Sequence, residues 1–114
     1  MTSTSATEIG WLAGLLEGEG SFGWTPAGKK SKKRYPKIEL SMTDEDTVRR
    51  VASISRMGNV YGPYEKAAPR KPVWRWSVTK QADAASLMMT MYPLMSGRRQ
   101  ERIREILLEW RQNA

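Results

Sequence analysis

The chain has 114 residues, with 19 Lys or Arg against 12 Asp or Glu, which gives a formal net charge of +7 at pH 7. This length fits one domain over residues 1–114, and the basic balance indicates a polyanionic partner, nucleic acid more often than a membrane. The absence of cysteine excludes disulfides, zinc fingers and thiol catalysis, and it fits a reducing compartment. No apolar stretch approaches the roughly 20 residues of a membrane span. The start lacks the basic residues of a secretion signal. We therefore expect a protein of the host-cell cytoplasm that is not secreted, with residues 1–6 flexible.

The first predicted element is a helix over residues 8–18, with Thr7 as its cap. Its apolar positions recur at helical spacing: Ile9, Leu12, Leu15 and Leu16. Glycine recurs at every fourth position, and each glycine lowers helix stability by about 1 kcal/mol relative to alanine: Gly10, Gly14 and Gly18. Close approach of a second helix would offset this loss. Two such helices would also bring Glu17 and Glu19 near their counterparts, an arrangement that favours a hard cation between them.

Two alternating strands are predicted next, over residues 21–25 and 35–42, and they form a hairpin. Phe22, Trp24 and the apolar residues at 38, 40 and 42 point inward, while the polar residues between them point outward. A basic run joins the strands: Lys29, Lys30, Lys32, Lys33, Arg34 and Lys37. This run is either a solvated hairpin tip or an arm that binds phosphates, and its place beside an alternating strand favours the arm.

A second hairpin is predicted over residues 59–64 and 73–78, after a helix over residues 45–57 that Thr43 or Asp44 can cap. In the last strand Arg75 and Ser77 point outward. Aromatic residues on strands are core residues more often than stacking platforms, so we assign three tryptophans to the core: Trp24, Trp74 and Trp76.

Two further helices are predicted, over residues 81–91 and from Gly97 or Arg98 to Trp110. The methionines around the junction fit a role as gap-filling core residues rather than as a promiscuous binding surface: Met88, Met89, Met91 and Met95.

The segment from Leu12 to Gly20 resembles the LAGLIDADG motif, and Ser21 and Phe22 continue it as in members of that homing endonuclease family. Seven of the nine letters are identical or exchange one acid for another, at Glu17 and Glu19. The other interpretation of this stretch is a buried helix with a polar end. The predicted order of helices and strands agrees with the family's fold. The resemblance implies an α+β fold of LAGLIDADG type, αββαββα, whose antiparallel four-stranded sheet saddles the DNA major groove.

The resemblance also implies an activity, namely a Mg-dependent DNA endonuclease. Such an enzyme makes a double-strand break by phosphodiester hydrolysis in a long, near-palindromic double-stranded DNA target, without a small-molecule substrate. Because the chain has one copy of the motif, the resemblance implies that it acts as a homodimer. A maturase or regulator of the same fold that binds DNA or RNA without cleavage is the alternative, and a small RNA-binding module is a third hypothesis.

The resemblance also implies roles for individual residues, according to their positions in the motif and in the predicted elements. Glu19 matches the metal-binding carboxylate, with the Gly18 carbonyl as an extra ligand for Mg²⁺, or for Mn²⁺ or Ca²⁺ in its place. Asp44 lies where a polar residue positions water, although a helix cap is the other interpretation. Gly97 lies where members carry lysine, and Arg98 is the substitute phosphate clamp. The expected dimer interface contains Gly10, Trp11, Ala13, Gly14, Glu17 and Gly18.

The expected DNA contacts come from the outward strand positions, the basic run and nearby basic residues. They are Ser21, Gly23, Thr25, Lys29, Lys30, Lys32, Lys33, Arg34, Tyr35, Lys37, Glu39, Ser41, Asn59, Tyr61, Arg70, Lys71, Arg75, Ser77 and Arg99.

Overall fold

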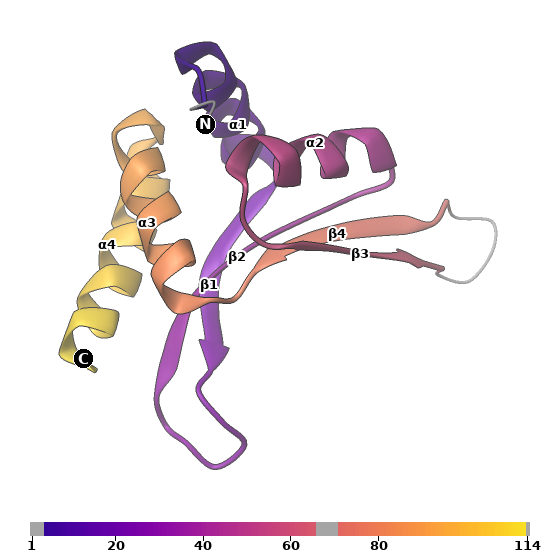
Figure 1. Ribbon diagram of the computed structural model, residues 1–114. Coiled ribbons are helices and arrows are strands. Elements are labelled where there is room, and N and C mark those ends of the chain that lie inside the picture. The colour runs from indigo at the N-terminus through magenta and orange to yellow at the C-terminus, as the bar shows by residue number, and fades with distance from the viewer. Residues whose placement is uncertain (1–3, 66–70, 114) are drawn as a thin grey trace.

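The computed structural model describes residues 4–65 and 71–113. The elements follow the predicted order and form an α+β fold (Figure 1). In chain order they are α1 (Ala6–Glu19), β1 (Gly20–Pro26), β2 (Arg34–Met42), α2 (Glu45–Ser55), β3 (Asn59–Tyr64), β4 (Val73–Val78), α3 (Gln81–Met91), the 3-10 helix η1 (Tyr92–Leu94) and α4 (Gly97–Gln112). Within the described ranges, no helix has the length and apolar character needed to cross a bilayer.

Helix α1 begins earlier than predicted because Ser5, not Thr7, caps it. The Ser5 hydroxyl accepts a hydrogen bond from the Glu8 N–H at 3.1 Å, and the Glu8 carboxylate accepts one from the Ser5 N–H at 3.0 Å. These two bonds form a capping box and hold the pKa of Glu8 below its usual value. The Thr4 hydroxyl also donates to the Ile54 carbonyl. Within the start that is expected to be flexible, Thr4 and Ser5 thus form hydrogen bonds, and residues 1–3 lie outside the described ranges.

The sheet is antiparallel throughout, with the strand order β1-β2-β4-β3. The helices lie on one side of it (Figure 1). Alternation along the strands directs apolar side chains to that side, where they form the core with the helices. Its fully buried members include Leu12, Leu16, Ile38, Leu40, Trp76 and Ile103. One apolar and one polar face is the arrangement that the predicted alternation requires.

The three tryptophans lie on the covered face, but the predicted core position is confirmed in full only for Trp76. Trp76 is fully buried and donates its indole N–H to the Met57 carbonyl at 2.9 Å. Trp24 and Trp74 are half-buried and pack against the core. Two guanidinium groups lie over the Trp24 ring, with Arg34 at 3.7 Å and Arg102 at 4.3 Å from its centroid, and Arg49 lies 5.2 Å from the Trp74 centroid.

The methionine prediction is wrong at one position. Met88, Met91 and Met95 are buried in the core, whereas the Met89 side chain is 55% exposed. Met89 directly follows a buried residue of α3, so the helical turn carries it to the outer surface.

Candidate nucleic-acid interface

The uncovered face of the sheet, here called the outer face, brings most predicted DNA-binding residues together. Strand register places Ser21, Glu39, Ser77 and Asn59 in one row across all four strands. Ser77 is buried within this row, which corrects its expected contact with DNA. The neighbouring rows contain Ser41, Arg75 and Tyr61, then Gly23 and Lys37, then Thr25 and Tyr35. The two hairpins diverge from the centre of the sheet as two arms (Figure 1). The outer face therefore offers a broad polar surface with hydrogen-bond donors and acceptors.

Glu39 organises the basic side chains at the centre of this face. Its carboxylate lies 2.8 Å from the Lys37 ammonium and 3.8 Å from the Arg75 Nε. The three side chains remain about a quarter to a half exposed, so these pairs contribute little to folding stability. These ion pairs instead place two cationic donors, Lys37 and Arg75, beside one carboxylate on the outer face.

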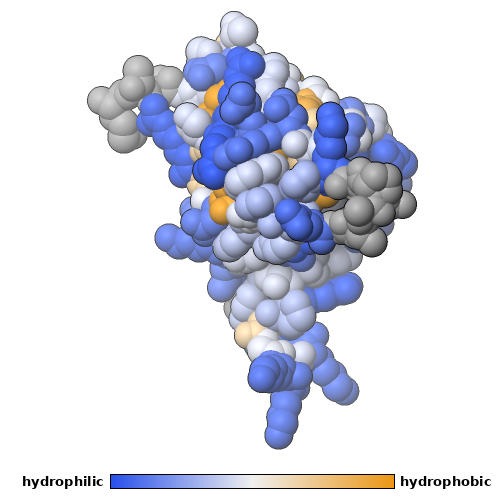
Figure 2. Space-filling model, turned by 90° about the vertical axis from the view of Figure 1, so that its right-hand side faces the viewer, coloured by the Kyte–Doolittle hydropathy of each residue, from blue (hydrophilic) through white to orange (hydrophobic). Residues whose placement is uncertain are grey.

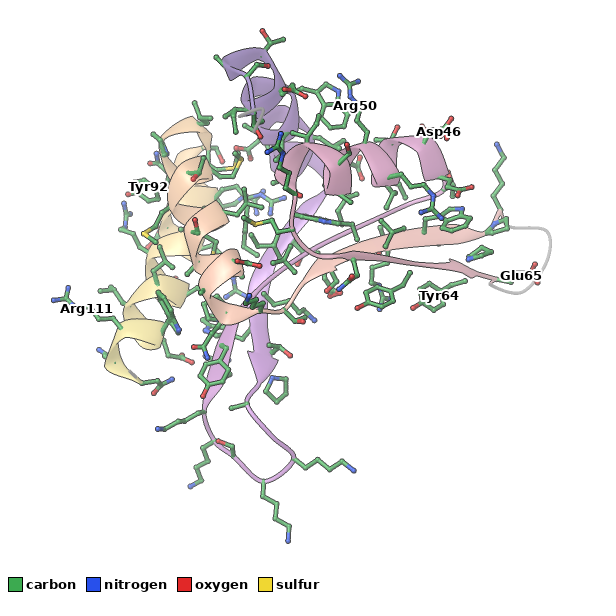
Figure 3. The ribbon with its side chains drawn as sticks, in the orientation of Figure 1. Asp46, Arg50, Tyr64, Glu65, Tyr92 and Arg111 are labelled. Carbon is green, nitrogen blue, oxygen red and sulfur yellow. The ribbon has the colours of Figure 1, made fainter. Side chains whose placement is uncertain are left out.

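Tyr64 is an outer-face residue that the sequence analysis missed. Simple alternation from Tyr61 directs position 64 to the covered face, but the register shifts between these two tyrosines. Gly62 adopts a φ of +125°, and a Cβ there would lie 2.9 Å from the Val73 carbonyl oxygen. After the shift Tyr64 pairs with Val73, and its ring lies below β3, away from α2 (Figure 3), with the Arg75 guanidinium 5.2 Å from its centroid. The Gly-Pro pair within β3 was the sequence signal for this bulge.

The tip of the first hairpin has the expected exposed basic side chains: Lys29, Lys30, Lys32 and Lys33. Backbone hydrogen bonds from Ala27 to the Lys33 carbonyl and from Ser31 to the Gly28 carbonyl shape the turn. Figure 2 shows the tip as a hydrophilic projection below the body of the molecule. Lys71 is also exposed, next to β4. Arg70 lies outside the described residues.

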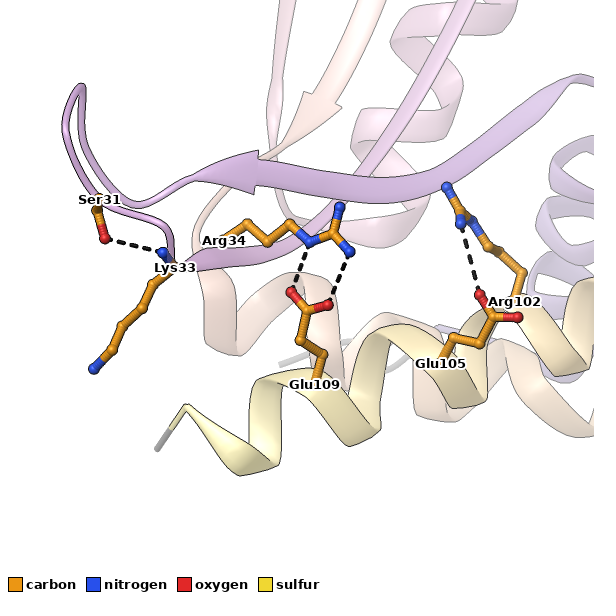
Figure 4. A network of polar contacts seen from close by, with 6 residues as sticks. All are labelled: Ser31, Lys33, Arg34, Arg102, Glu105 and Glu109. Carbon is orange, nitrogen blue, oxygen red and sulfur yellow. Dashed lines mark hydrogen bonds and ion pairs between the residues drawn. The ribbon is translucent and has the colours of Figure 1, made fainter.

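Arg34 is directed differently from its neighbours in the basic run. Its Nε and Nη2 donate to the two carboxylate oxygens of Glu109 at 2.7 and 2.9 Å, on the covered side of the sheet (Figure 4). This contact lowers the pKa of Glu109 and raises the pKa of Arg34. The structure thus corrects the expected orientation of Arg34 toward DNA: the side chain joins β2 to α4.

Glu19 is the last residue of α1, and it opens onto the outer face. Its side chain is exposed and lines a hollow of about 270 Å³ with Ser21, Glu39, Ser41 and Arg75, among others. The next residue, Gly20, caps the helix through its N–H and is already part of β1. A Cβ on Gly20 would lie 2.7 Å from the Leu16 carbonyl oxygen, so this abrupt junction requires glycine.

Glu17 has a different environment, although it lies only two residues earlier. Its carboxylate accepts hydrogen bonds from the backbone N–H and hydroxyl of Ser96, at 2.6 and 3.0 Å, which joins α1 to the start of α4. The Ser96 N–H lowers the pKa of Glu17. Arg99 lies 3.7 Å from the same carboxylate and donates to the Glu17 carbonyl at 3.0 Å. Arg99 is therefore bound to α1 by two contacts and is only partly exposed, although it also lines the hollow beside Arg98.

Neither of the other two expected catalytic residues lines the Glu19 hollow. Asp44 occupies the N-cap position of α2, but its carboxylate accepts from the Thr47 hydroxyl instead of forming a cap bond. Arg98 is exposed and lines a second hollow, of about 460 Å³, with Arg102 and Glu105. Ser21 borders both hollows. Arg98 thus adjoins the Glu19 site, whereas Asp44 lines neither hollow.

The glycine stripe of α1 is open. At Gly10, Gly14 and Gly18 a Cβ would meet no atom of the described chain within 4 Å, and all three residues are exposed. Trp11 is half-buried beneath the Arg50 guanidinium, 4.2 Å from its ring centroid. Ala13 is buried in the core of its own chain, so its expected place in a dimer interface is corrected.

Comparison with solved structures identifies the fold. The chain superposes on the homing endonuclease I-CvuI in complex with DNA with a TM-score of 0.71 and 11% identity, over 90% of this chain and 64% of that one. For the group I intron-encoded homing endonuclease I-CeuI complexed with DNA, the TM-score is 0.69, with 16% identity, over 99% of this chain and 59% of that one. For the LAGLIDADG meganuclease I-AabMI bound to uncleaved DNA, the TM-score is 0.66, with 10% identity, over 88% of this chain and 34% of that one.

No family model and no curated protein matches the sequence. The chain spans less than two thirds of the length of I-CvuI and of I-CeuI. The structural matches nevertheless agree with one another and with the motif at residues 12–20. The chain has the fold of the LAGLIDADG homing endonucleases.

Proposed function

We propose that the chain is a Mg-dependent homing endonuclease that acts as a homodimer in the host-cell cytoplasm. It makes a site-specific double-strand break in a long, near-palindromic DNA target. The observation that carries this proposal is the position of Glu19, an exposed carboxylate at the junction of α1 and β1 that opens onto the polar outer face. Glu17, the other acid of the motif, is already bound to Ser96.

Double-stranded DNA is the proposed partner because cationic groups lie on both arms of the outer face. The lysines of the hairpin tip suit phosphate contacts, and Arg75, with Glu39 behind it, suits the two acceptors on the major-groove edge of guanine. Structures with this fold, including I-CvuI and I-CeuI, contain DNA. The proposed DNA-binding surface is thus the outer face together with the tip.

A homodimer supplies what one chain lacks. Within the described ranges, no group of three or more acidic side chains that could hold a metal is present. Two α1 helices packed along their open glycine stripes would bring Glu19 of each chain to one seam. We therefore propose that the active site forms only between two copies.

The donor set fits magnesium, since the Glu19 carboxylate and the Gly18 carbonyl are hard oxygen ligands at exposed positions. When bound, the metal would lower the pKa of a water molecule and stabilise charge on the phosphate oxygens. Arg98, in the adjoining hollow, would neutralise the phosphate as a fixed cation, because a guanidinium stays protonated near neutral pH and does not act as a general acid or base. Asp44 stays a prediction as a water-positioning residue. Structures of I-CvuI with DNA were obtained in the presence of Mg and of Ca.

The test is cleavage of a randomised duplex library by the purified protein, with sequencing of the cut ends. We expect Mg²⁺-dependent cuts at one near-palindromic sequence and no cuts when EDTA is present. Binding without cuts in Mg²⁺ and in Mn²⁺, over a range of salt concentrations, would refute the nuclease proposal and favour a non-cleaving DNA- or RNA-binding protein. A monomer bound to half a site in sedimentation would refute the dimer.

A further inference from the structure

The outer side of the α3 and α4 pair carries an apolar groove that the proposed nuclease does not use. Two hollows, of about 470 and 330 Å³, share Met89, Leu107 and Arg111 in their linings. Leu108 lines the larger hollow and Trp110 the smaller. We call this surface the α3/α4 groove. It lies on the far side of these helices from the sheet, where Figure 3 shows Tyr92 and Arg111.

The apolar side chains of the groove are more exposed than core packing explains. Met89 is 55% and Leu108 is 56% exposed, whereas Met88 and Ile106 beside them are fully buried. Single exposed apolar residues are common on soluble proteins, but Met89 and Leu108 line the same hollow together. Contiguous apolar surface with a charged rim is typical of a protein interaction site.

The charged residues that line the groove are all positive. Arg104, Leu107, Leu108 and Arg111 follow one face of α4, so an arginine lies at each end of the leucine pair. Arg104 is held there by Tyr92, whose hydroxyl accepts from it. The acids of α4 lie elsewhere: Glu101 and Glu105 line the hollow beside Ser21, and Glu109 binds Arg34. The described lining of the groove thus contains two arginines and no acid.

We propose that the α3/α4 groove binds an acidic amphipathic helix of a protein partner. Leucine-like side chains on one face of that helix would fill the two hollows, and its glutamates would pair with Arg104 and Arg111. A second copy of this chain is a poor occupant, because a two-fold contact through the groove would place the arginines of one copy against those of the other with no acid in the lining to pair with them. The groove lies beyond the helices that cover the sheet, so DNA on the outer face leaves it accessible.

The direct test uses a defined probe and the full chain. A fluorescein-labelled helical peptide carries leucines along one face and glutamates elsewhere, and a matched peptide carries lysine at each glutamate. Fluorescence anisotropy should show saturable binding of the acidic peptide, with the lysine peptide at least about tenfold weaker and the difference reduced by salt. The Arg111→Glu variant should reverse this preference.

Two leucine variants locate the binding surface. Leu108→Glu should weaken the acidic peptide by at least about tenfold. Leu94→Glu is the matched control, since Leu94 is 50% exposed and lines neither hollow, and it should leave peptide binding unchanged. Both variants should keep the circular dichroism and the melting temperature of the parent chain, because both positions are exposed.

Three outcomes would overturn the proposal. Equal affinity for the acidic and lysine peptides would show non-specific hydrophobic binding without charge selectivity. No binding of the acidic peptide at any concentration up to the solubility limit would leave the groove without this occupant. Assembly beyond a dimer that Leu108→Glu abolishes in sedimentation would show that a second copy occupies the groove. None of these outcomes depends on cleavage, so failure here and failure of the nuclease proposal are distinguishable.

Discussion

The two faces of the sheet use the same kinds of charged residue in opposite ways. On the covered side, Arg34 of β2 binds both carboxylate oxygens of Glu109 in α4, and Glu17 of α1 accepts two hydrogen bonds from Ser96 at the start of α4. On the outer face, Arg75 reaches Glu39 only at 3.8 Å, and Glu19 opens onto a hollow. Charged groups of the covered side thus connect helices to other elements, whereas those of the outer face pair only within the sheet, as Glu39 does with Lys37 and Arg75, or open onto a hollow, as Glu19 does.

This contrast separates residues that sequence position would group together. Lys33 and Arg34 are adjacent cations, and Glu17 and Glu19 are neighbouring acids of one motif, yet each pair is divided between the two environments. We expect substitutions on the outer face to alter DNA binding or cleavage with little change in the melting temperature. Substitutions on the covered side should lower the melting temperature with little change in DNA binding or cleavage.

The largest expected effect is that of Glu19→Gln. Loss of the carboxylate should reduce cleavage by more than about a thousandfold, beyond the 10- to 100-fold typical of groups that only support a metal ligand. DNA affinity, measured in Ca²⁺ by anisotropy, and the melting temperature should stay near those of the parent chain. Glu17→Gln is the matched control, and cleavage that survives in Glu19→Gln would place the metal elsewhere.

The next effect concerns the hairpin tip. Replacement of Lys29, Lys30, Lys32 and Lys33 by alanine should weaken DNA binding and flatten its dependence on salt, by about 0.9 in the log-log slope for each phosphate that is no longer neutralised. Arg34→Gln removes an adjacent positive charge that is bound to Glu109, so it should change that slope much less. Equal slopes for the parent and the four-lysine variant would show that the lysines of the tip do not contact DNA phosphates.

Arg75→Gln tests base recognition on the outer face. If Arg75 contacts a guanine, affinity for the preferred target should fall by roughly tenfold to a hundredfold, and specificity should relax at one base pair in each half-site. Sequencing of selected sites measures both effects. A uniform loss over all sequences would instead assign Arg75 to a phosphate.

The covered face is tested by Glu109→Gln. Loss of the carboxylate leaves the Arg34 guanidinium without its charged partner at the base of the hairpin, so the melting temperature should fall modestly. High salt should reduce the difference from the parent chain, because the pair is partly exposed. A larger effect on cleavage than on melting would contradict a structural role.

The smallest effect is the pH dependence of Glu17→Gln. The pKa of Glu17 is lower in the folded chain than its ordinary value of 4.5. Its contribution to stability is therefore present above that ordinary value and is lost as pH falls through the lower folded pKa. The melting temperature of Glu17→Gln should lie below that of the parent at pH 7, and the two curves should converge as the pH falls through the lowered pKa of Glu17 in the folded chain. A constant gap would indicate a loss that is independent of charge.

Local patterns in the sequence predicted the elements well. The alternation over residues 35–42 and 73–78 identified the strands and their polar faces, and the motif identified the fold. Contacts between distant elements were beyond local pattern, because nothing in the sequence shows that Glu17 meets Ser96 or that Arg34 meets Glu109. Tyr64 was missed because the bulge at Gly62 reverses the alternation on which its assignment depended.

Glu19 and Gly20 join α1 directly to β1, with no residue between helix and strand. Inserting or deleting one residue at this junction would exchange the two sides of β1, exposing Phe22 and burying Ser21, because side chains alternate along a strand. The junction therefore constrains the length of the segment as well as requiring glycine at position 20. A designer who wishes to retarget the protein can vary Ser21, Gly23 and Thr25 freely only while the residue count from Leu12 to Pro26 stays fixed.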